Sequence, residues 1–98
     1  MKKGIIVGKE ESRWTKAGET EQRVSRTLHV LWDPPKKAED ALDGRRVEAV
    51  RCSFDISDIP VGAYCQFDFD IRNSAKGSYA VLSDVEVLRS YNIVLEEI

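Results

Sequence analysis

The segment 63–72 constrains the fold more than any other part of this sequence, because its side chains alternate between apolar and polar. The apolar positions are Cys65, Phe67, Phe69 and Ile71, and the intervening positions are Tyr64, Gln66, Asp68 and Asp70. Successive side chains of a β-strand point to opposite faces of a sheet, so this pattern predicts a half-buried strand. The turn-forming residues 73–78 separate it from a second β-rich segment, 79–88, and the two segments predict a hairpin.

Earlier segments predict three further strands, at residues 4–9, 23–32 and 45–54. The polar segment 10–21 is expected to be a loop between the first two. Arg26 interrupts the apolar side of the second of these strands near its start, which predicts a strand that projects past the core.

The alternation of apolar and polar residues is less regular in the third predicted strand, and a proline-containing segment precedes it. Its apolar residues occupy odd positions at first, Val47 and Ala49, and even positions afterwards, at Val50, Cys52 and Phe54. Such a change predicts a bulge or a sheet corner. Upstream, Asp33-Pro34-Pro35 must end the preceding strand because proline has no N–H to donate, and residues 36–42 favour a short helical turn.

Five strands and at most one short helix predict an all-β protein with a single domain, residues 1–98. A chain of 98 residues falls at the lower end of the usual domain size of about 100–150 residues. We expect a five-stranded, OB-like small β-barrel with a projecting hairpin, because a barrel protects strand edges better than a flat sheet. Residues 89–98, which include Ile93-Val94-Leu95, are expected to add an extra edge strand or to dock on a partner.

Several classes of protein are excluded at this stage. No apolar run approaches the roughly 20 residues of a membrane helix, and no signal peptide follows Met1, so we expect a cytoplasmic protein with no membrane partner. Cys52 and Cys65 lack the spacing of a zinc site and are expected to be small core residues. With a single histidine, His29, and scattered glycines, the chain is expected to be no enzyme and to hold no cofactor or metal.

Charge is unevenly distributed along the chain. Residues 1–32 contain seven Lys or Arg and four Glu, a net charge of +3, whereas residues 33–98 have a net charge of −5. The whole chain has a formal net charge of −2, which by itself argues against nucleic-acid binding. The basic third either forms one cationic face or is a solvated strand surface of mixed charge.

The basic third also contains the residues most typical of a binding site. Arginine, lysine, histidine and tryptophan gather on the predicted first loop and second strand, at Arg13, Trp14, Lys16, Arg23, Arg26 and His29. Arg45 and Arg46 on the predicted third strand extend this set. Single-stranded nucleic acid needs cations along its backbone and exposed rings for its bases, and Trp14 either stacks on a base or packs back on the core.

The order of these features resembles the gene V type of single-stranded-DNA-binding protein from filamentous phages, a family of small OB-fold dimers. The resemblance follows Met1-Lys2-Lys3, the loop Thr15-Lys16-Ala17-Gly18, the turn Pro60-Val61-Gly62-Ala63-Tyr64, the hairpin turn Lys76-Gly77-Ser78 and the strand Val81-Leu82-Ser83-Asp84-Val85-Glu86-Val87. It implies that Lys16 lies in a DNA-binding loop and that Arg23 or Arg26 lies in the strand segment beside it. Lys76 stands where the family has an aromatic residue, and Glu86 stands where the family is basic.

Two functions follow as hypotheses. The first is a homodimeric protein that binds single-stranded nucleic acid, most simply DNA, as a replication or mobile-element accessory factor. The alternative is a non-enzymatic protein-interaction module that docks a partner through the acidic hairpin face or the C-terminal tail. The acidic face consists of Asp68, Asp70, Asp84 and Glu86.

Overall fold

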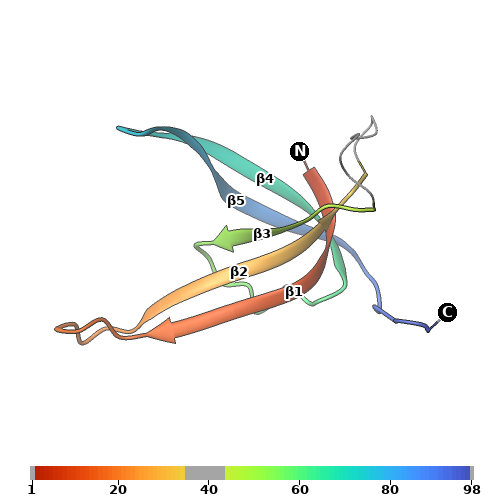
Figure 1. Cartoon of the computed structure of the whole chain (residues 1–98), viewed down its shortest axis with the longest axis horizontal. Coiled ribbons are helices and arrows are strands. Elements are labelled where there is room, and N and C mark those ends of the chain that lie inside the picture. Colours follow the sequence, from red (N-terminus) through yellow and green to blue (C-terminus); the bar gives the residue numbers. More distant parts are fainter. Residues whose placement is uncertain (1, 35–43, 98) are drawn as a thin grey trace.

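The computed structural model describes residues 2–34 and 44–97, and these form one sheet of five antiparallel strands with no helix (Figure 1). The strands are β1 (Lys2–Trp14), β2 (Arg23–Trp32), β3 (Val47–Cys52), β4 (Ala63–Ser74) and β5 (Gly77–Ser90). Their order in the sheet is β3-β2-β1-β4-β5, so β3 and β5 are its edges. The predicted all-β class is confirmed, but the sheet is not closed into a barrel. The predicted helical turn at 36–42 lies outside the described residues.

The first strand is longer than its sequence indicates. Residues 10–14, predicted as loop, pair with the first half of β2, and only residues 15–22 connect the two strands. Polar residues lie opposite each other along this extension, such as Glu11 and Arg26, with 3.1 Å between the carboxylate and the guanidinium. Because both faces are polar, apolar alternation cannot reveal such a strand.

Irregular pairing occurs at other places than the one predicted. β3 pairs with β2 in unbroken register, so the predicted bulge in β3 is wrong. The apolar positions change from odd to even because Val47 lies exposed on the outer face of the sheet. The shifts instead lie in β1, between Ile6 and Gly8, and in the β4–β5 hairpin. One of them makes Ser83 an extra residue on β5, which puts Val81 opposite Asp70 and therefore on the other face from Val85.

The core lies on the inner face of the curved sheet. It contains Phe67, Ile6, Leu28, Val30 and Cys65, all fully buried, with Trp32 packed edge-on against Phe67 at 5.0 Å between ring centroids. Cys52 is buried as well, and both cysteines are free thiols, which confirms their prediction as small core residues.

The connection between β3 and β4 covers one end of this core. Ile56 and Ile59 are buried there, and the Lys9 ammonium donates a hydrogen bond of 3.1 Å to the Ile56 carbonyl. Gly62 ends the connection with φ of 95°, a left-handed conformation that favours glycine. Its N–H donates to the Ile6 carbonyl, and its own carbonyl accepts from Tyr91 N–H, so this glycine joins β1 to the end of β5.

Two hairpins extend beyond the core. The β1–β2 arm comprises residues 10–27, and the β4–β5 arm comprises residues 70–81. β1 pairs with β4 only through Lys2–Ile5. β1 then curves away, and Figure 1 shows the tips of both arms at the same end of the molecule, splayed apart, while the C-terminal segment leaves the opposite end. The predicted projecting strand is therefore part of one of two projecting hairpins.

Candidate nucleic-acid interface

The β1–β2 arm carries an exposed aromatic ring beside a guanidinium. Trp14 is the last residue of β1 and lies directly opposite Arg23, the first residue of β2, so the two side chains share a face. The Trp14 side chain is 46% exposed and belongs to no part of the buried core, which excludes its packing there. The Arg23 guanidinium donates two hydrogen bonds to the carboxylate of Glu19 in the connection before β2, at 2.9 Å and 2.6 Å.

Strand alternation divides the predicted basic cluster between two faces. His29 shares the outer face with Trp14 and Arg23, because all three lie at alternate positions of the paired strands. Arg13 and Arg26 lie on the opposite face, where both approach the carboxylate of Glu11. The cluster that is continuous in sequence is therefore two clusters in space.

The arginines before β3 lie far from this aromatic. β3 begins at Val47, so Arg45 and Arg46 precede the strand on which they were predicted. The Arg45 guanidinium donates two hydrogen bonds to the carbonyl of Trp32, at the end of β2 opposite to Arg23. Nine residues of extended strand separate the two ends, about 30 Å. These arginines are thus not brought together with the arm residues.

The second arm repeats the arrangement of the first, and the sequence reasoning missed its two principal residues. Arg72 on β4 lies directly opposite Tyr79 on β5, and Tyr79 is 50% exposed. Lys76 occupies the turn, where its N–H donates to the Ser74 hydroxyl. Counting outward from the two-residue turn pairs Ser74 with Gly77 and hence Arg72 with Tyr79, a signal that the sequence already contained.

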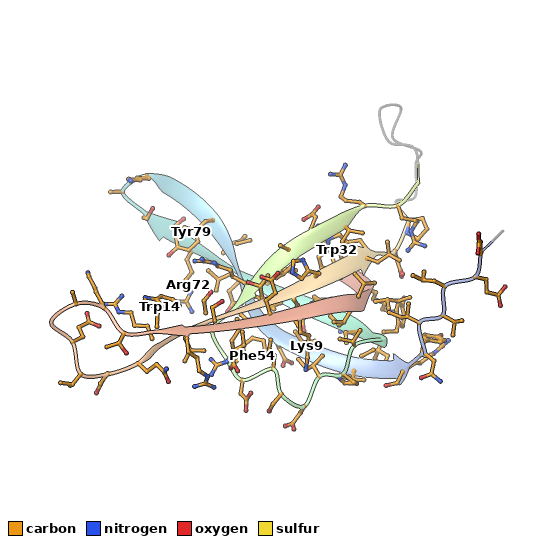
Figure 2. All side chains as sticks on the ribbon, turned by 60° about the horizontal axis from the view of Figure 1, so that its bottom comes forward. Lys9, Trp14, Trp32, Phe54, Arg72 and Tyr79 are labelled. Atoms are coloured by element: carbon orange, nitrogen blue, oxygen red, sulfur yellow. The ribbon has the colours of Figure 1, made fainter. Side chains whose placement is uncertain are left out.

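Trp14 of the first pair and both residues of the second pair point into the space between the arms in the view of Figure 2. The two aromatic rings therefore lie on different arms, at the end of the molecule where both arms project. Exposed rings beside guanidinium groups match in chemistry an extended chain that carries flat groups and negative charges.

Several cations of this region are engaged in exposed ion pairs. These are Arg13 with Glu11 (3.3 Å), Arg23 with Glu19 (2.6 Å) and Arg26 with Glu11 (3.1 Å). The His29 imidazole lies 3.1 Å from the Glu10 carboxylate. Exposed pairs contribute little to stability, so a phosphate can replace the glutamate at low cost. Lys16, Arg72 and Lys76 make no ion pair with any residue that the structure describes, so none of the described carboxylates competes with a ligand for them.

Groups suited to covalent or metal chemistry are not gathered at this surface. Burial raises the pKa of the Cys65 thiol to about 11 and that of the Cys52 thiol in the same direction, which keeps both protonated near neutral pH. Over residues 2–34 and 44–97, no three His, Cys, Asp or Glu side chains are grouped to hold a metal ion. What the surface offers is non-covalent: rings, guanidinium groups and ammonium groups.

Comparison of the chain with protein-family models, curated proteins and solved structures found no match in any of the three. Within the described part of the chain, no helix has the length and apolarity needed to cross a membrane.

Proposed function

We propose that this protein binds single-stranded nucleic acid in the opening between its two arms. The observation that carries the proposal is the repeated pair, an exposed ring directly opposite an arginine, on both hairpins: Trp14 with Arg23, and Tyr79 with Arg72. Bases of any sequence stack on aromatic rings, and neighbouring cations neutralise the phosphates between them. Binding of this kind needs no catalytic group.

The proposal includes a partly open, OB-like barrel. In the observed order β1 is central and pairs with both β2 and β4, which leaves β3 and β5 as the two edges that a barrel would bring together. OB folds bind oligonucleotides with the face of their second and third strands and with the loops after the first and fourth strands. Those two loops correspond here to the tips of the β1–β2 and β4–β5 arms.

Fluorescence anisotropy with a labelled oligothymidine, at low and moderate salt, tests the proposal. We expect salt-sensitive binding of the full chain, and a loss of affinity for Trp14→Ala and Tyr79→Ala. Base stacking on a ring contributes about 1–3 kcal/mol, which corresponds to roughly 5- to 150-fold in Kd for each variant.

A matched control separates the arms from exposed aromatics in general. Tyr91 is 47% exposed, nearly the same as Tyr79, but it lies just beyond the other end of β5. Tyr91→Ala should therefore bind as the parent chain does. The proposal is wrong if the parent chain shows no salt-sensitive binding, or if Tyr79→Ala and Tyr91→Ala lose the same affinity.

A further inference from the structure

The two edge strands of the sheet border a cavity of about 510 Å³, here called the seam cavity. Residues 48–51 of β3 line one side, residues 80–82 of β5 line the other, and the rings of Trp32 and Phe69 contribute apolar surface. β3 and β5 are not hydrogen-bonded to each other. Edge strands present unpaired backbone N–H and C=O groups, which readily accept a further strand.

The indole N–H of Trp32, beside the seam cavity, has no hydrogen-bond acceptor among the described residues. The Trp32 side chain is only 7% exposed, so this donor is buried. Buried donors are nearly always paired in folded proteins, so an unpaired one indicates a missing group. An occupant with apolar side chains and a free strand edge would suit the apolar lining of the cavity and its two unpaired strand edges.

The C-terminal segment has the composition of such an occupant. Residues 91–97 form no strand, and the exposed fractions of Ile93, Val94 and Leu95 are 49%, 73% and 94%. These apolar residues precede the acidic pair 96–97. Among residues 2–34 and 44–97, the segment is not packed against the buried core, which leaves this aliphatic surface exposed.

Charges at the seam cavity complement the acidic end of the segment. Lys2 and Arg51 both line the cavity, and the Lys2 ammonium lies 5.0 Å from the centre of the Trp32 ring. Glu48 also lines it, but its carboxylate lies 3.9 Å from the Arg46 guanidinium. The cations Lys2 and Arg51 are thus available to the carboxylates that follow Leu95.

Residues 92–97 are too short to run along the whole seam cavity of their own chain. A hydrogen bond of 2.8 Å from Tyr91 N–H to the Gly62 carbonyl fixes their start, and Val81 lies nine residues before Ser90 on β5, about 30 Å along the strand. The six residues 92–97 span only about 20 Å when extended. Figure 1 shows the segment leaving the end of the molecule away from the arms, where it is open to a second copy.

We propose that two copies of this chain form a dimer in which residues 92–97 of each copy add as a strand to the β3 edge of the other and fill its seam cavity. Six extended residues match the length of β3, Val47–Cys52. Exchange in both directions gives a closed two-fold assembly, the commonest symmetry of soluble oligomers. This inference is independent of nucleic-acid binding.

Sedimentation equilibrium of the full chain tests the assembly. We expect twice the chain mass of 11.1 kDa for the parent protein and a single chain mass for Leu95→Asp. Leu95 is 94% exposed, so this substitution leaves the fold of one copy unchanged. Val61→Asp, at a residue 50% exposed outside the segment and the cavity, is the control and should remain dimeric. A monomeric parent, an open-ended polymer, or a dimeric Leu95→Asp would overturn the proposal.

A second measurement locates the contact. In the full-length Leu95→Asp chain, we expect a peptide of residues 91–98 to shift the NMR resonance of the Trp32 Nε1–H, and a scrambled peptide of the same composition to leave it unchanged. A peptide that binds without moving this resonance, or that does not bind, would show that the segment does not occupy the seam cavity.

Discussion

Replacement of Phe67 by alanine tests where the core ends and the β4–β5 arm begins. Phe67 is fully buried and packs edge-on against Trp32 at 5.0 Å. Truncating a buried phenylalanine costs about 3–5 kcal/mol, and the lost aromatic pair favours the upper part of that range. A domain of this size has a free energy of unfolding near the low end of about 5–15 kcal/mol, so Phe67→Ala should be close to unfolded at 25 °C.

Ile71→Ala is the matched control for this substitution. Ile71 lies four residues further along β4 and points to the same side of the strand, but it is 69% exposed on the arm. Its truncation should change the free energy of unfolding by at most about 0.5 kcal/mol. In urea denaturation followed by circular dichroism, the midpoint should fall by roughly 2–4 M for Phe67→Ala and by less than about 0.5 M for Ile71→Ala. Similar losses for the two variants would refute the description of residues 70–81 as an arm free of the core.

Three further predictions concern a glycine, a thiol and a lysine. Gly62→Ala should destabilise the fold by about 2–4 kcal/mol in the same assay, because an added Cβ would lie 2.0 Å from the Tyr91 carbonyl oxygen. Gly18 has a similar φ of 85° but open space around it, so Gly18→Ala is the control and should cost only about 1–2 kcal/mol. The raised pKa of Cys65, about 11, means that the folded chain retains a proton that the unfolded chain loses above about pH 9. Stability should therefore fall by roughly 2–3 kcal/mol between about pH 9 and pH 11, and Cys65→Ala should lack this component when the two pH profiles are compared. Lys16→Gln should lower the slope of log Kd against log salt for oligothymidine by about 0.7, and an unchanged slope would place Lys16 away from the phosphates.

The fold was predictable from the sequence wherever one strand face is apolar and the other polar. The strand that contains Phe67 and the hairpin that follows it both appear as the alternation indicates, since burial on one side imposes a period of two. The end of β1 was not predictable in this way. Residues 10–14 are polar on both faces and form a strand because they pair with β2, not because they bury apolar surface.

The candidate interface was predictable only in part, because proximity in sequence is not proximity on a sheet. Trp14 and Arg23 were both identified, and pairing places them opposite each other. Arg26, three residues after Arg23, lies on the other face because odd spacing reverses the direction of a strand side chain. Arg72 and Tyr79 were missed because they became visible only as a cross-strand pair.

The seam cavity could not be foreseen at all. It depends on how far the curvature of the sheet brings the β3 edge toward the β5 edge, and the sequence pattern carries no measure of that curvature. Bulges such as the one between Ile6 and Gly8 bend strands and increase their twist, and they occur where the alternation is interrupted.

The fluorescence of Trp14 gives the most direct test of the central claim, that the arms hold single-stranded nucleic acid. The chain has two tryptophans, and Trp32→Phe leaves Trp14, 46% exposed, as the only indole. Titration of this variant with oligothymidine should quench the Trp14 emission, and added salt should restore it. An emission that stays constant while anisotropy reports binding would place the nucleic acid elsewhere, and the absence of both changes would contradict the proposed function.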